Sequence, residues 1–176
     1  HSLADLADIY VNDAFSVSHR KHASLEAITH FLPSFAGFAF EKEIFHLNKA
    51  LNAPRPRVWI LGGAKLDKTD MILQALKKAD KVLIGGALGF PFLKAKGYQI
   101  GQSKINSTSV TNAKKILKKW SSKKIVLPLD FLVTERLSPR AKVEERNYNQ
   151  IGPHKIALDI GPKTIKLFKQ HLSKAR

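Results

Sequence analysis

The stretch VWILGGAKLDK, residues 58–68, decides the fold of most of this chain. Four apolar residues lead directly into two glycines, which an alanine and Lys65 follow. This order predicts a buried strand that ends in a tight turn beside a cation. A second run of the same kind, KVLIGG, follows at residues 81–86. We therefore expect two strands that both end in glycine.

Helical patterns alternate with these strands along the chain. We expect helices over residues 69–79, 90–97, 108–120 and 162–175, and two further strands within residues 123–133 and 154–161. Short apolar strands that alternate with helices are typical of an α/β fold, a parallel sheet with helices on both faces. The sequence therefore predicts a Rossmann-like domain with four parallel strands.

Glycines follow three of the four expected strands. Gly62 and Gly63 follow the first, Gly85 and Gly86 the second, and Gly161 the fourth. Ligands bind at the carboxyl ends of strands in such sheets. Glycine lets a charged ligand approach the backbone closely, and a lysine in that position suits phosphate. We expect these glycines and Lys65 to share one edge of the sheet.

Charge divides the chain near Pro54. The formal net charge is +16, but residues 1–53 carry a net −2 and residues 54–176 a net +18. The break predicts two structural units, and the cations of the second favour an anionic partner, either phosphate ligands or nucleic acid. A lysine-rich solvated surface is the alternative, because lysine outnumbers arginine 23 to 7.

Composition excludes several classes of protein. The chain lacks cysteine, which rules out disulfides and thiolate metal sites. It lacks an apolar run of about 18 residues and a recognisable signal peptide, so we expect a cytoplasmic protein with no membrane partner. The start at His1 leaves open whether these residues are a whole protein or a piece of one.

Familiar site motifs are missing. The sequence holds no P-loop motif and no G-x-S-x-G motif, and GGALGF does not fit the dinucleotide pattern G-x-G-x-x-G. His19 and His22 lie three residues apart, but no third ligand accompanies them, so we expect no zinc site.

Six motifs together resemble one family, phosphoglycerate kinase, most closely its bacterial type. They occur in the family's order and at about its spacing, over nearly the whole chain. The motifs are YVNDAFSVSHRKHAS, FLPSFAGF with EKE, LGGAKLDK, LIGGALGFPFLKAKGY, IVLPLDFLV and LDIGPKT.

The resemblance implies three parts of a two-lobed enzyme. Residues 1–38 would end the phosphoglycerate-binding lobe, residues 39–53 would form the interdomain helix, and residues 54–176 would be an incomplete nucleotide-binding lobe. Arg20 would grip the phosphoglycerate, with His19 and His22 nearby. Bidentate binding of phosphate or carboxylate suits a guanidinium. The nucleotide residues would be Gly63, Ala64, Lys65, Lys68, Gly85, Gly86 and Gly161.

The resemblance also implies the reaction, phosphoryl transfer between 1,3-bisphosphoglycerate and ADP that gives 3-phosphoglycerate and ATP in glycolysis. Arg20 and Lys65 would be the catalytic residues. Magnesium would arrive with ADP or ATP, and no protein ligand for it is identified in this chain. We expect a monomer. Phosphoryl transfer depends chiefly on positioning and on positive charge around the moving group.

Two departures from the family bear on activity. The family's second lysine falls at Thr69, with Lys68 one residue earlier, and the sequence leaves open whether Lys68 replaces it. The family's early basic motifs and its late GGGDT-type loop are absent. We therefore expect the 176 residues alone to lack turnover.

A binding protein is the rival interpretation. A shortened enzyme with a basic sheet domain, recruited to RNA or a ribonucleoprotein, would use its lysines on phosphates without reading bases. No aromatic residues interleave with Lys114, Lys115, Lys118 and Lys119. We therefore expect nucleic-acid binding, if any, to be weak and non-specific.

Overall fold

The computed structural model describes residues 2–63, 69–120 and 123–175. The chain forms two compact units, residues 1–53 and residues 54–176. The boundary coincides with the change of charge near Pro54. Within the described ranges, no helix is long and apolar enough to cross a membrane.

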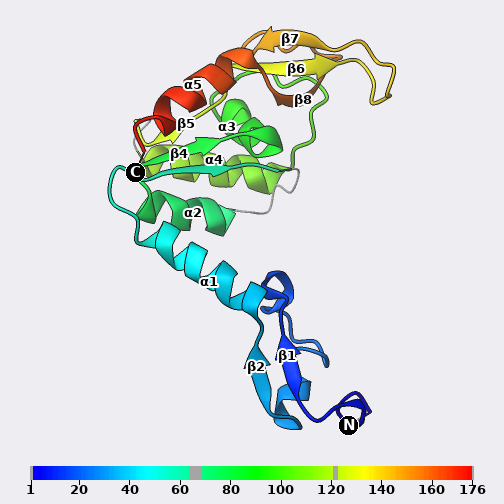
Figure 1. Cartoon of the computed structure of the whole chain (residues 1–176). Helices are drawn as coiled ribbons and strands as arrows, with labels where there is room; N and C mark the ends of the chain where they lie inside the picture. The colour runs from blue at the N-terminus through cyan, green and yellow to red at the C-terminus, as the bar shows by residue number, and fades with distance from the viewer. Residues whose placement is uncertain (1, 64–68, 121–122, 176) are drawn as a thin grey trace. The chain divides into compact units, whose positions relative to one another are not determined.

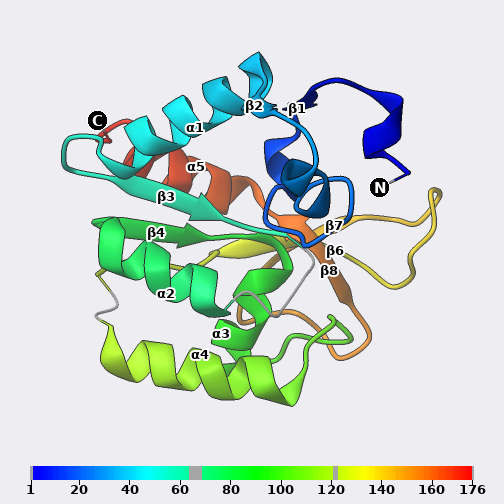
Figure 2. The ribbon, with the colours of Figure 1, turned by 90° about the horizontal axis from the view of Figure 1, so that it is seen from below.

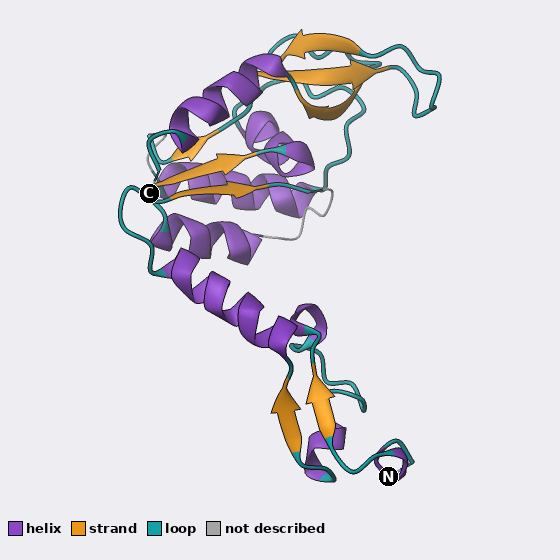
Figure 3. Cartoon of the chain, viewed as in Figure 1, coloured by secondary structure: helices purple, strands orange, loops and turns teal. Residues whose placement is uncertain are grey.

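The first unit pairs two short parallel strands and ends in a long helix. β1 (Tyr10–Asn12) pairs with β2 (Ser34–Ala36), as Figure 3 shows. Three 3-10 turns, η1 (Ala4–Leu6), η2 (Phe15–Val17) and η3 (Ala27–His30), flank or join the strands. Helix α1 spans Phe38–Leu51, close to the interdomain helix expected over residues 39–53. The pattern did not predict β2, whose three residues are all exposed.

Asp13 fixes the start of α1. Its carboxylate Oδ1 accepts hydrogen bonds from the backbone N–H groups of Ala39 at 2.7 Å and Phe40 at 3.0 Å. The N-cap residue is Gly37, and a Cβ there would overlap the Asp13 side chain. A carboxylate from the end of β1 therefore satisfies N–H groups that an N-cap side chain usually serves.

The second unit contains the predicted parallel sheet. Its order is β3-β4-β5, with all neighbours parallel. The strands are β3 (Val58–Leu61), β4 (Lys81–Ile84) and β5 (Ile125–Val126). The helical elements that alternate with them are α2 (Thr69–Lys78), η4 (Gly86–Leu88), α3 (Gly89–Ala95) and α4 (Ser107–Lys119).

Helices cover both faces of this sheet, which confirms the predicted fold class. Helices α2 and α4 lie on one face and α5 (Pro162–Leu172) on the other, as Figures 1 and 2 show. Ile72 and Leu76 of α2 and Ile116 of α4 pack with Val82 and Ile84 of β4 in one apolar cluster. The cluster also takes in Trp120 at its border, while the four lysines of α4 are exposed, as the helical pattern predicts.

The prediction for the fourth strand was wrong, because this strand does not join the parallel sheet. β8 (Ile156–Ile160) pairs antiparallel with β6 (Asp130–Thr134), and β6 pairs antiparallel with β7 (Glu144–Asn147). These strands form a second sheet of order β7-β6-β8. The segment that was expected to form the third strand forms two strands instead, β5 and β6. Pro128 lies between them and has no N–H group to donate to a strand ladder.

Candidate functional site

Glycines at the carboxyl ends of β3 and β4 allow the backbones that follow the two strands to lie close together. Gly85 donates its N–H to the Leu61 carbonyl at 2.8 Å. A Cβ on Gly62 would lie 3.6 Å from the Gly85 carbonyl oxygen, and one on Gly86 would lie 3.2 Å from the Gly63 nitrogen. We call Gly62, Gly63, Gly85 and Gly86 the glycine edge.

Two members of the glycine edge have backbone conformations that L side chains rarely adopt. Gly63 has φ 128° and Gly86 has φ 57°. Gly62 and Gly63 are exposed, Gly86 is half-buried and Gly85 is buried. Side chains at these positions would strain the turns and narrow the gap between them. The backbone is therefore accessible from solvent at Gly62 and Gly63 and partly at Gly86, whereas Gly85 is covered.

The end of β8 borders the same place, although β8 belongs to the other sheet. A Cβ on Gly85 would lie 3.7 Å from Ile160 Cγ2 and 3.8 Å from Phe168 Cε2. Gly161 therefore follows a strand that ends beside the glycine edge, although that strand does not belong to the parallel sheet in which it was expected. Gly161 itself is buried and points toward Asp130, since a Cβ on Gly161 would lie 2.5 Å from the Asp130 carboxyl carbon.

Asp130 holds the start of α5 in the way that Asp13 holds the start of α1. Asp130 is 1% exposed. Its carboxylate accepts the N–H of Lys163 at 2.9 Å, the N–H of Thr164 at 2.8 Å and the Thr164 hydroxyl at 2.6 Å. The Thr164 hydroxyl in turn accepts the Leu129 N–H at 2.9 Å.

This Asp130–Thr164 pair was not among the residues that the sequence singled out. It joins β6 to α5 and so fixes the turn after β8 that borders the glycine edge. The only local signals were a proline at the first position of α5 and a threonine two residues later.

Three predicted nucleotide residues, Ala64, Lys65 and Lys68, lie outside the described residues. The neighbouring Thr69, which stands where the family has its second lysine, is described. Its Oγ1 accepts a hydrogen bond from Asn112 Nδ2 of α4 at 3.1 Å. Thr69 therefore ties α2 to α4 at the start of the helix.

The predicted phosphoglycerate residues lie in the first unit. His19, Arg20 and His22 are all exposed and follow η2. The Arg20 N–H donates to the Val17 carbonyl at 3.0 Å, and the His22 carbonyl accepts two backbone N–H groups, from Leu25 and Glu26. The backbone of this loop is thus held while its basic side chains face solvent. Among the residues with described positions, no three His, Asp or Glu side chains gather as a metal site.

The whole chain matches one protein family. A sequence model of the family described as phosphoglycerate kinase matches residues 1–176. The chain belongs to the phosphoglycerate kinase family. Curated relatives include the phosphoglycerate kinases of Pseudothermotoga lettingae, 48% identical over 180 residues, and of Coprothermobacter proteolyticus, 45% identical over 179 residues. The alignments cover 98% and 99% of this chain.

Solved phosphoglycerate kinase structures agree with the fold. The enzyme from Coxiella burnetii gives a TM-score of 0.80 at 31% identity and covers 98% of this chain. The enzyme from Pyrococcus horikoshii gives 0.84 at 29% identity and covers 99%. The chain spans about 45% of the length of the curated relatives, and 46% and 45% of these two structures.

Proposed function

We propose that this chain contributes to a phosphoglycerate kinase that moves a phosphoryl group between 1,3-bisphosphoglycerate and ADP, in cytoplasmic glycolysis. The observation that carries the proposal is the glycine edge, in a chain that matches the family from residue 1 to residue 176. Exposed backbone after β3 and partly exposed backbone at Gly86 after β4 suit a flat, charged ligand, and the carboxyl edge of a parallel sheet is where such ligands bind.

The nucleotide would bind along the glycine edge. Gly63, Gly85 and Gly86 would let it lie close to the backbone, and Ala64 would lie next to it by its place in the motif. Lys65 and Lys68 follow in the sequence and would meet the phosphates, where a lysine acts as a compact positive charge. Mg²⁺ carried by the phosphates would offset their negative charge. Gly161 would line the same site through the turn that Asp130 and Thr164 hold.

Phosphoglycerate would bind to the basic loop of the first unit. Arg20 presents five donors in a rigid fork, which suits a carboxylate or a phosphate, and its exposed position leaves that fork accessible. His19 and His22 would add donors beside it. Catalysis in this scheme comes from holding the two substrates in line and from positive charge on the moving group.

The first prediction concerns nucleotide affinity. The chain should bind ADP, and Lys65→Ala should weaken binding roughly 10- to 100-fold, because a charge-assisted hydrogen bond contributes about 1.5–3 kcal/mol. Titration calorimetry with MgADP measures it. The matched control is Lys77→Ala, an exposed lysine in the last turn of α2, which should change affinity less than about twofold. Equal losses in both variants would remove Lys65 from the phosphate site.

The second prediction is that the 176 residues alone show no measurable turnover. Their length is about 45% of the curated relatives, and we expect that groups which hold the substrates in line lie in the part of the relatives that these residues do not cover. A misplacement of about 1 Å already costs about 100-fold in rate. A coupled assay with 3-phosphoglycerate and MgATP measures it. Turnover that Arg20→Ala abolishes would show instead that these residues suffice.

A further inference from the structure

The second unit has a cavity of about 350 Å³ outside the glycine edge. It follows β5, the last strand in the order β3-β4-β5, whose outer edge pairs with no strand among the described residues. Residues 125–129 all line it, that is, the two residues of β5 and the three residues that follow it. Leu93 of α3 and Leu117 of α4 also line it, and so does Leu167 of α5. The cavity is therefore a walled groove along the sheet's edge, which we call the β5 groove.

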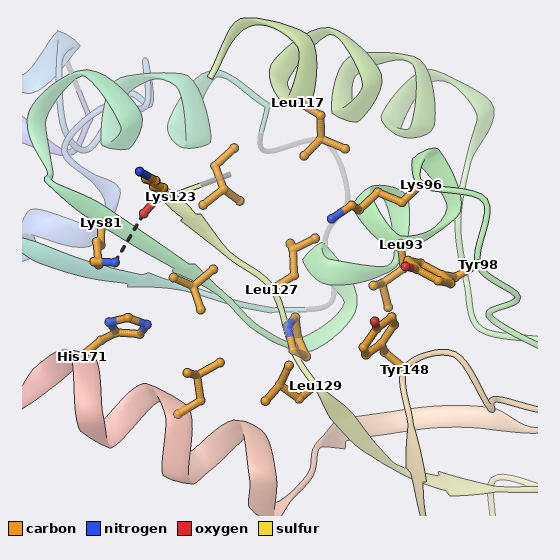
Figure 4. Close-up of a pocket in the computed structure, with 14 residues that line it drawn as sticks. Lys81, Leu93, Lys96, Tyr98, Leu117, Lys123, Leu127, Leu129, Tyr148 and His171 are labelled. Atoms are coloured by element: carbon orange, nitrogen blue, oxygen red, sulfur yellow. Dashed lines mark hydrogen bonds between the residues drawn. The ribbon is translucent and has the colours of Figure 1, made fainter. Parts of the chain in front are cut away.

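The two ends of the β5 groove differ from its middle. Figure 4 shows Lys81, Lys123 and His171 together at one end, and Tyr98 beside Tyr148 at the other, with leucines between. The two tyrosine rings meet edge to face, with centroids 4.8 Å apart. Lys96 also lines the groove. The described residues that line it include four basic side chains and no carboxylate.

Charge is concentrated at the end where β4 begins. Lys81 Nζ donates to the Lys123 carbonyl at 3.4 Å, which leaves its ammonium with further N–H groups to donate. Burial lowers the pKa of His171, and the positive charges of Lys81 and Lys174 lower it further. Lys81, Lys123 and His171 thus lie at one end of the groove, and none of the described residues that line it carries a carboxylate, so this end favours an anion.

We propose that the β5 groove binds a small amphiphilic anion, a carboxylate with an unbranched apolar chain. The carboxylate would meet Lys81, Lys123 and His171, and the chain would lie over Ile125, Leu127 and Leu129 toward the tyrosine pair. A cavity of this size is in the range of small-molecule sites, which are mostly apolar with a few placed polar groups.

The groove suits such a ligand better than an added peptide strand. β5 has only two residues in its ladder, and Pro128 follows two residues later without an N–H to donate. A peptide would therefore find few backbone partners along this edge. An apolar chain needs none, and each buried methylene strengthens binding.

The groove is distinct from the proposed nucleotide site. Lys81 starts β4, whereas Gly85 and Gly86 follow its other end, and none of the four glycines lines the groove. The inference therefore does not depend on nucleotide binding, and ADP should not displace the ligand.

Decanoate is the probe for the test, used below its micelle concentration. Binding is followed through the His171 ring signal in NMR spectra, which His171→Gln identifies among the seven histidines. We expect decanoate to shift this signal and raise the pKa of His171, because an anion beside the ring favours its charged form. Affinity should rise about fourfold per methylene from octanoate to decanoate. Decanol, which lacks the charge, should bind at least about 10-fold more weakly.

Matched variants locate the site. Lys81→Gln should weaken decanoate binding about 10-fold, and Lys77→Gln, on an exposed lysine outside the groove, less than about twofold. Leu129→Gln should weaken it as well, because Leu129 is 40% exposed and the change leaves the core intact. Equal binding of decanol, equal effects of the two lysine variants, or displacement by MgADP would each overturn the proposal.

Discussion

Asp130→Ala should lower the free energy of unfolding of residues 54–176 by about 3–4 kcal/mol. The substitution removes the acceptor of three hydrogen bonds, from Lys163 N–H, Thr164 N–H and the Thr164 hydroxyl. It also removes a negative charge from the amino end of α5, where the helix dipole favours an anion. Because Asp130 is 1% exposed, water cannot readily replace the lost acceptor.

Tryptophan fluorescence during urea unfolding measures this change. Both tryptophans of the chain, Trp59 and Trp120, lie in the second unit and pack against its core cluster, so their signal reports that unit alone. Asp130→Asn should have an intermediate effect, because the amide keeps one acceptor oxygen and loses the charge.

Asp159→Ala is the matched control for Asp130→Ala. Asp159 Oδ1 also accepts a backbone N–H, from Ile160 at 2.7 Å, but Asp159 is exposed. Its removal should cost less than about 1 kcal/mol, since water takes over the N–H. A loss for Asp130→Ala no larger than this control would show that the Asp130–Thr164 pair does not hold α5.

The sequence predicted the elements whose signals are local. The bounds of α1 were predicted to within two residues, because an apolar period starts after Gly37 and two prolines follow Asn52. α4 was likewise predicted, as a helix over residues 108–120, where Ile116 and Trp120 recur at helical spacing among lysines. The strand-end glycines were found because they follow apolar runs directly.

The elements that the sequence did not predict depend on pairing. β2 is a short exposed strand, and β7 is EERN, a polar run without the alternation that marks a strand. β8 runs antiparallel to β6, as β7 does, and no pattern within β8 encodes that direction. The Asp130 cap joins residues 33 and 34 positions apart, beyond any local window. Lys65 lies outside the described residues, so its role stays a prediction.

Gly161→Ala should destabilise the second unit by about 2–3 kcal/mol. Gly161 has φ −90° and ψ 178°, an extended conformation open to any residue, so backbone strain does not contribute. The cost comes from the added Cβ, which would lie 2.5 Å from the Asp130 carboxyl carbon and one of its oxygens. Asp130 is buried and bonded to α5, so it cannot move away without breaking the cap.

A double-mutant cycle isolates that contact. In the Asp130→Ala background the clashing atoms are absent, so Gly161→Ala should change stability by less than about 1 kcal/mol. The coupling between the two sites should therefore be about 2 kcal/mol. Tryptophan fluorescence serves again as the readout. Additive effects of the two substitutions would contradict the contact and return Gly161 to the role of a glycine kept open for a ligand.

The equivalent pair in the first unit shows why burial, and not the capping geometry alone, sets the size of the effect. Gly37 precedes α1 as Gly161 precedes α5, and a Cβ on Gly37 would overlap Asp13 just as closely. Asp13, however, is exposed, so its side chain can rotate into water when a methyl group enters. The displaced Asp13 carboxylate stays solvated, and water can accept hydrogen bonds from the N–H groups of Ala39 and Phe40. Buried Asp130 can neither move into water nor be replaced by it as an acceptor. The same glycine-to-alanine change should therefore be costly before α5 and mild before α1.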